Sequence, residues 1–217
     1  MLENPESDPL AVFVQFTEQY DESQGRRMKP RINAIVAVIA MFFVPPVLAG
    51  GEAISDIEKV DIAGIKNYSR LSGSAGFGGE VVGFGGATQP SAMILLKNAG
   101  FSTVINLRLD SEEGVEMEAS RAIAEAEGLQ YIHLPLDSAK VDPVVIDNIL
   151  ATVGDQANQP VYIHCGSATR AAALWMIGRV LKDGWEIDAA SAEAEMIALK
   201  PPEAIAFATA YIKSNGR

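Results

Sequence analysis

VYIHCGSATR, residues 161–170, has the pattern of a short apolar strand that runs directly into the first turn of a helix. Val161, Tyr162 and Ile163 make the strand apolar throughout, which is typical of a buried strand in a parallel sheet. Backbone amides in a tight turn between strand and helix tend to point inward, and the helix dipole adds positive potential there. The stretch therefore predicts both a strand–helix unit and an anion-binding loop at the edge of a sheet.

Two reactive side chains bracket this loop. Cys165 opens it, and the field of the helix start favours the ionised thiolate, which is a nucleophile. Arg170 lies on the first helical turn, where its planar guanidinium can hold two oxygens of an anion. Ser167 or Thr169 could donate a hydrogen bond to the sulfur. The residues of the predicted anion-binding loop are all small: Gly166, Ser167, Ala168 and Thr169.

Cys165 is the only cysteine, so the chain cannot form an internal disulfide or a metal site built on several thiolates. The two histidines, His133 and His164, are too few for most zinc sites. We therefore expect chemistry without a metal or another cofactor. The alternative interpretation is that Cys165 is a buried small apolar residue, which is the usual state of a free cysteine.

Four more side chains are candidates for the surroundings of the loop. We expect His164 to order the loop by hydrogen bonding to backbone. Arg108 follows a predicted strand, where it would either help bind the anion or pair with the acidic residues at 112–113. Gln89 and Ser91 would line the pocket, unless this segment, with Thr88, serves to cap a helix.

Strands alternate with helices along most of the chain, which predicts a single α/β domain with a mostly parallel sheet flanked by helices. Residues 50–77 form an N-terminal arm that we expect to be irregular, and the glycine-rich patch 73–86 a flexible loop. The main domain spans 78–217. Strands are predicted at 80–85, 101–107, 129–134 and 161–164, and helices at 92–99, 112–127, from Pro143 with Asp142 as cap, and at 168–183, 188–199 and 202–213.

Residues 28–49 have the pattern of an export signal. Lys29 and Arg31 precede the apolar run 34–44, and small residues stand before a cut between Ala49 and Gly50. Cleavage at this point predicts a periplasmic or secreted protein. The alternatives are a membrane anchor that is not cleaved and, less favoured, a helix of the core. Residues 1–27 would be a disordered leader, or would lie before the true start at Met28.

The composition also bears on partners. The 217-residue chain has a net charge of −11, which argues against nucleic acid because phosphate backbones are bound by Lys and Arg. Contact with a membrane is expected only through the segment 28–49. The partner predicted from the loop is an anionic substrate that bears phosphate or sulfur.

His-Cys-x-x-x-x-Arg after an apolar strand resembles the phosphatase-like domain of beta-lactamase hydrolase-like proteins, a branch of the dual-specificity phosphatase superfamily. Three other segments resemble that family in the same order: Gly85-Gly-Ala-Thr-Gln-Pro-Ser91, Val104-Ile-Asn-Leu-Arg108 and Tyr131-Ile-His-Leu-Pro-Leu-Asp137. Together the segments cover roughly residues 78–185. The resemblance implies a fold of the cysteine phosphatase II type.

The resemblance also implies roles for particular residues. Cys165 would be the nucleophile that carries a covalent intermediate, and Arg170 would stabilise the transition state. Asp137 would be the general acid that protonates the leaving group. Asp142 is the alternative acid, although its place before Pro143 favours a helix cap.

Three functions remain open from the sequence. The first is an exported cysteine-dependent phosphatase that acts on a phosphoprotein or a small phosphoester through a phosphocysteine. The loop is one residue shorter than in familiar tyrosine phosphatases, and rhodanese-type sulfurtransferases also use a short loop. The second is therefore a sulfurtransferase that forms a persulfide on Cys165. The third is a catalytically inactive module that only binds anions.

Overall fold

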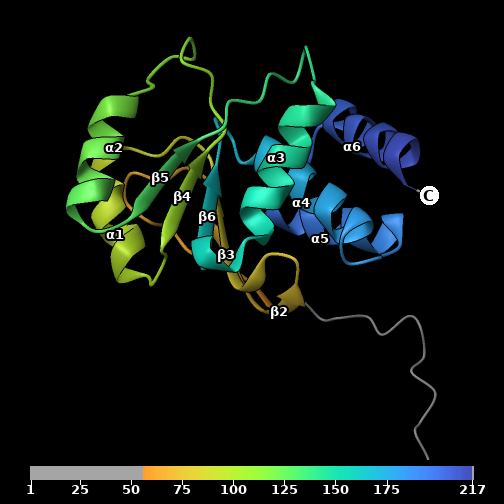
Figure 1. Cartoon of the computed structure of the whole chain (residues 1–217), viewed down its shortest axis with the longest axis horizontal. Helices are drawn as coiled ribbons and strands as arrows, with labels where there is room; N and C mark the ends of the chain where they lie inside the picture. The colour runs from red at the N-terminus through yellow and green to blue at the C-terminus, as the bar shows by residue number, and fades with distance from the viewer. Residues whose placement is uncertain (1–55, 217) are drawn as a thin grey trace, which may run out of the picture. The chain divides into compact units, whose positions relative to one another are not determined.

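The computed structural model describes residues 56–216, all within one compact unit (Figure 1). The predicted leader (1–27), the predicted export signal (28–49) and the first residues of the predicted arm lie outside the described residues, so export stays a prediction. Between residues 56 and 216, none of the helices combines the length and the apolar character needed to cross a membrane.

A six-stranded sheet forms the centre of this unit, in the order β1-β2-β3-β6-β4-β5. The neighbours from β3 to β5 run parallel, whereas β1 and β2 are added antiparallel at one edge. The mostly parallel α/β fold predicted from the sequence is therefore confirmed. The strands are β1 (Asp56–Lys59), β2 (Ser69–Gly76), β3 (Gly79–Gly85), β4 (Thr103–Asn106), β5 (Gln130–His133) and β6 (Val161–His164).

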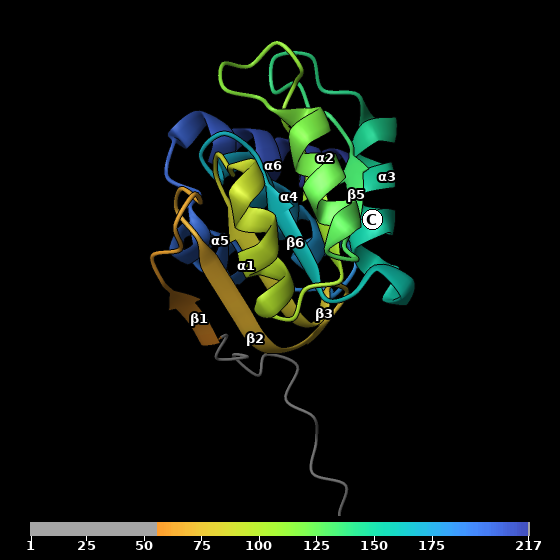
Figure 2. The same ribbon diagram turned by 90° about the vertical axis from the view of Figure 1, so that its left-hand side faces the viewer.

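Helices cover both faces of the sheet, with α1 and α2 on one face and α3 to α6 on the other (Figures 1 and 2). The neighbours Tyr162 and Ile163 of β6 belong to the two different cores, because successive side chains of a strand point to opposite faces. The helices are η2 (Pro90–Ala92), α1 (Met93–Asn98), α2 (Met117–Ala126), α3 (Pro143–Gly154), η3 (Gln156–Asn158), α4 (Thr169–Leu181), α5 (Ile187–Ile197) and α6 (Pro202–Asn215).

The prediction of an irregular arm over residues 50–77 was wrong for its described part. Residues 56–76 contain β1 and β2, which pair with each other and with β3. The glycine patch is likewise not a flexible loop, since β2 and β3 occupy most of it. Gly83 shows why glycine is used there: a Cβ at this position would lie 2.5 Å from the ring of Phe101. Glycine in a strand commonly marks such a close approach.

Two helix starts also differ from the prediction. α2 begins at Met117 rather than at residue 112, because the side chain of Glu112 is bound to arginines in the loop before it. The helix expected from residue 92 begins with the short turn η2, and no side chain caps it. The Thr88 hydroxyl donates instead to the carbonyl of Gly86 and shares a hydrogen bond of 2.8 Å with the hydroxyl of Tyr162.

A buried charged cluster joins α4 to α5. Arg179 of α4 donates to Glu193 of α5 over 2.8 Å, and the indole nitrogen of Trp175 donates to the same carboxylate over 2.6 Å. The Arg179 guanidinium also lies 4.5 Å and 4.3 Å from the ring centres of Trp175 and Trp185. Both tryptophans therefore pack in this cluster, which fixes the helix that carries Arg170.

Candidate active site

The loop after β6 lies at the carboxyl edge of the parallel strands. β6 is between β3 and β4, and His164 is in register with Gly85 on one side and Asn106 on the other. The amide of Cys165 donates to the carbonyl of Gly85 over 3.1 Å. Ligands of open α/β sheets bind at this edge, at the point where strand order reverses. Cys165 therefore opens its loop at the place where such a fold gathers its functional groups.

The loop turns into α4 through a residue with left-handed backbone. Ala168 has φ 72° and ψ −8°, and Thr169 begins the helix directly after it. This conformation is uncommon for a residue with a Cβ. Alternation of right- and left-handed residues builds the concave turns whose amides bind anions. The predicted anion-binding loop thus has a backbone suited to that role.

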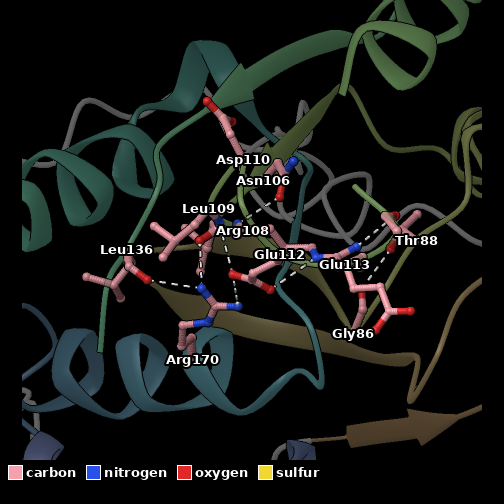
Figure 3. A network of polar contacts seen from close by, with 12 residues as sticks. Gly86, Thr88, Asn106, Arg108, Leu109, Asp110, Glu112, Glu113, Leu136 and Arg170 are labelled. Carbon is pink, nitrogen blue, oxygen red and sulfur yellow. Dashed lines mark hydrogen bonds and ion pairs between the residues drawn. The ribbon is translucent and has the colours of Figure 1, made fainter. Parts of the chain in front are cut away.

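Arg170 extends from α4 to the loops that follow β4 and β5 (Figure 3). Its Nη1 donates to the carbonyls of Leu107 and Leu136, over 3.1 Å and 3.0 Å. Its Nη2 forms an ion pair of 2.7 Å with Oε1 of Glu112. The side chain is 17% exposed, so the guanidinium is held by the protein and does not extend into solvent.

Glu112 is the important site residue that the sequence did not identify. Its carboxylate pairs with Arg170 and, over 3.2 Å, with Nε of Arg108, and it also accepts from the amide of Leu109 (Figure 3). A Cβ built on Gly166 would lie 3.2 Å from Oε2 of Glu112. The carboxylate therefore sits directly beside the loop and binds Arg170 as a substrate oxyanion would.

The charges around Glu112 change its acidity. Burial raises the pKa of this carboxyl, but hydrogen bonds from the Leu109 amide, Arg170 and Arg108, with the positive charge of Arg170, outweigh burial. The net pKa lies below the ordinary value of 4.5. Glu112 is therefore ionised at neutral pH and neutralises part of the positive charge of this site.

Arg108 holds the loop after β4. Its guanidinium binds Glu112 and donates to the carbonyls of Glu113 and Gly114. The ion pair with the acidic residues at 112–113, which was one of the two sequence interpretations, is present. A direct contact between Arg108 and a bound anion would require some of these bonds to break.

His164 is buried and stacks on Tyr162, with ring centres 5.7 Å apart. Burial lowers its pKa to about 3, and the positive charge of Arg108 contributes further. Interactions with the backbone of Gly86 and Cys165 raise the pKa only in part. Neither ring nitrogen has a well-formed hydrogen bond among residues 56–216. The ring is therefore neutral, and its interactions with the backbone of Gly86 and Cys165 fall short of well-formed hydrogen bonds.

The two candidate acids have different surroundings. The Asp142 carboxylate accepts from the amide of Val144 over 2.9 Å and caps α3, as the sequence suggested. The Asp137 carboxylate accepts from the amide of Ala139, within a turn of its own loop. Asp137 directly follows Leu136, whose carbonyl binds Arg170. The backbone just before Asp137 therefore contacts the guanidinium, while the Asp137 carboxylate itself is bound within its own turn.

The hydroxyls of the loop are directed away from the sulfur. Ser167 Oγ donates to Thr169 Oγ1, which in turn donates to the carbonyl of Ala198. The expected hydrogen bond from either hydroxyl to Cys165 is thus not formed. Gln89 and Ser91 are exposed. The backbone N–H of Gln89 donates to the carbonyl of Gly64 rather than to the loop.

Cys165 itself is 1% exposed and contacts the apolar core. Burial alone would fit the interpretation of a small packing residue. The position after β6, the left-handed turn at Ala168 and the arginine at the helix start favour a nucleophile at the base of an anion loop. In this conformation the Cys165 sulfur is shielded from solvent, and the guanidinium of Arg170 is paired with the Glu112 carboxylate. The described part of the chain contains no cluster of three or more side chains suited to hold a metal.

Comparison with known families decides the wider identity. Residues 85–182 match the model of the phosphatase-like domain of beta-lactamase hydrolase-like proteins. This match covers somewhat less than half of the chain, which is therefore similar to this family over residues 85–182. The resemblance of the Cys165 loop, and of the segments before it, is therefore confirmed. No curated protein matches the chain significantly in sequence.

Solved structures share the fold of the phosphatase-like domain. A protein of Shewanella putrefaciens CN-32 described as a DUF442 phosphatase superposes with a TM-score of 0.54 at 20% identity, over 71% of this chain and 96% of that one. TpbA of P. aeruginosa superposes with a TM-score of 0.52 at 19% identity, over 72% of this chain and 88% of TpbA. The core catalytic domain of SIW14 of S. cerevisiae superposes with a TM-score of 0.54 at 15% identity, over 71% of this chain and 91% of that one. At these identities the likeness establishes the fold alone.

Replacement of Glu112 by Gln tests the electrostatic role of this carboxylate. At pH 7 we expect the Glu112→Gln variant to lose about 1–2 kcal/mol of unfolding free energy, because two arginines lose an ionic partner. A depressed pKa in the folded state stabilises the fold above the unfolded value and ceases to do so as pH falls through the folded value. The difference between variant and wild type should therefore shrink as the pH falls below 4.5. Urea unfolding of both proteins over a range of pH measures this difference in unfolding free energy.

The exposed neighbour Glu113, varied to Gln, serves as the control and should change stability little at any pH. A Glu112→Gln deficit of the same size at pH 3 and pH 7 would contradict the ionic role.

Proposed function

We propose that the chain is a cysteine-dependent phosphatase that hydrolyses phosphomonoesters through a phosphocysteine on Cys165. The observation that carries the proposal is the guanidinium of Arg170, which already binds a two-oxygen anion, the Glu112 carboxylate, beside the loop that Cys165 opens. TpbA, one of the proteins with this fold, has been solved in complex with pTyr as a Cys-to-Ser variant, and SIW14 is a PP-IP phosphatase. Both support phosphate as the anion.

Substrate binding begins with an exchange at Arg170. The phosphate oxygens take the place of the Glu112 carboxylate at Nη2, while the carbonyls of Leu107 and Leu136 keep Nη1 in position. A guanidinium fixed on one side loses less freedom when it binds a ligand on the other. The loop amides and the start of α4 stabilise the remaining negative charge.

The reaction then has two steps. The Cys165 thiolate attacks phosphorus, the bond to the leaving oxygen breaks, and Asp137 gives that oxygen its proton. Water next attacks the phosphocysteine, the sulfur–phosphorus bond breaks, and the Asp137 carboxylate takes up the proton of the water. Arg170 stabilises the charge that develops on the phosphoryl oxygens in both transition states. Thiolate and free phosphate are the products.

The nature of the covalent intermediate separates this function from sulfur transfer. We expect wild-type protein to hydrolyse an aryl phosphate, and the Cys165→Ser variant to lose turnover by several orders of magnitude because the nucleophile is gone. Intact mass after rapid acid quench should show a phosphoryl adduct on Cys165. A separate incubation with thiosulfate should leave the mass unchanged.

A persulfide after thiosulfate treatment, without any phosphatase turnover, would instead establish the sulfurtransferase. Retention of tungstate binding in a wild-type protein that forms neither adduct would establish an inactive anion-binding module.

The general acid is tested by two matched variants. Asp137→Asn should lower kcat by about 10²–10⁴-fold for a substrate with a poor leaving group, because proton donation is lost. Asp142→Asn should change kcat little and lower the unfolding free energy by at most about 1 kcal/mol, since it weakens only the cap of α3. Steady-state kinetics with an alkyl phosphate and urea unfolding measure both. The reverse pattern would assign the acid to Asp142.

A further inference from the structure

A groove of about 630 Å³ lies beside the anion loop and has no part in the mechanism above. One wall comes from the end of β1 and the segment between β1 and β2, and the other from the end of α5 and its connection to α6. Ser167 and Thr169 of the loop also line it. Its volume is within the range of pockets that hold small molecules. The groove therefore begins at the loop and leads away from it.

A hydrogen bond connects the wall between β1 and β2 to the loop. The side-chain amide of Asn67 donates to the carbonyl of Ser167 over 3.1 Å, across a separation of 100 residues. Asn67 has left-handed backbone with φ 53°, a conformation that asparagine tolerates better than most residues. This bond fixes the wall against the loop, so a ligand held by the loop has the groove beside it.

The charge of the groove differs from that of the protein. Lys59 and Lys200 line it from opposite walls, and Asp61 is its one carboxylate among the described residues. Two cations and one anion give it a positive balance, whereas the whole chain carries −11. All three side chains are exposed and available to a ligand. The exposed side chain of Val60 and the half-buried Pro201 supply apolar surface.

We propose that this groove binds the leaving-group part of a phosphomonoester that carries a second anionic group, and that Lys59 and Lys200 bind that group. The proposal rests on the proposed function, since the loop must hold the phosphate end. The apolar surface suits a small organic body between the two anions. Asp61 opposes the second anion by like charge, so its removal should have the opposite effect to removal of a lysine.

Two phosphonates that cannot be hydrolysed test this inference: phenylphosphonate and 3-carboxyphenylphosphonate. Isothermal titration of the wild type should give tighter binding of the carboxylated ligand by about tenfold. The preference is the dissociation constant of phenylphosphonate divided by that of 3-carboxyphenylphosphonate. Lys59→Met and Lys200→Met should each reduce this ratio by about threefold to fivefold. Asp61→Asn should increase the ratio. Lys213→Met, an exposed lysine on α6 outside the groove, is the control and should leave it unchanged.

Equal affinity of the wild type for the two ligands would overturn the inference, as would a Lys213→Met effect equal to that of the groove lysines, or no binding of either phosphonate. Aryl phosphate turnover is measured on the same preparations. Turnover without a preference for the carboxylated ligand would reject the groove and leave the phosphatase intact. A preference without turnover would reject the phosphatase and leave the groove intact.

Discussion

The position of one guanidinium decides whether this fold has a working site. Arg170 is fixed on one side by the carbonyls of Leu107 and Leu136, which come from the loops after β4 and β5. Its other side faces Glu112 and, beyond it, the loop of Cys165. Three loops at the carboxyl edge of the sheet thus meet at one side chain, on whose position the proposed anion site depends.

The pairing of Arg170 with Glu112 compensates a charge that is largely buried, whereas Cys165 is buried by its contacts with the apolar core. A desolvated guanidinium without a counter-ion would be costly, so an internal carboxylate compensates it when no substrate is bound. The same carboxylate lies beside Gly166 of the loop. Substrate phosphate offers more charge and more acceptor oxygens than Glu112, and it also gains the loop amides and the helix start. In the proposed function, this ion pair keeps Arg170 in position until phosphate replaces Glu112.

Much of the central fold could be predicted because its signals are local. β6 was predicted to the residue, because a short apolar run stands directly before the loop that Cys165 opens. The Asp142 cap and Pro143 located the start of α3. β1 was missed because it is a short, mostly exposed edge strand without alternation. Glu112 was missed as a site residue because its role depends on which loops meet in space. In sequence it resembled an acidic first turn of a helix.

The account rests on the claim that the loop and Arg170 together bind a tetrahedral oxyanion over the Cys165 sulfur. A crystal structure of the protein with tungstate tests this most directly. The account predicts tungstate within hydrogen-bond distance of Arg170 Nη2 and of the loop amides, close to the sulfur, with the Glu112 carboxylate displaced and Nη1 still on its two carbonyls. A loop left empty at saturating tungstate, with Arg170 still paired to Glu112, would contradict it.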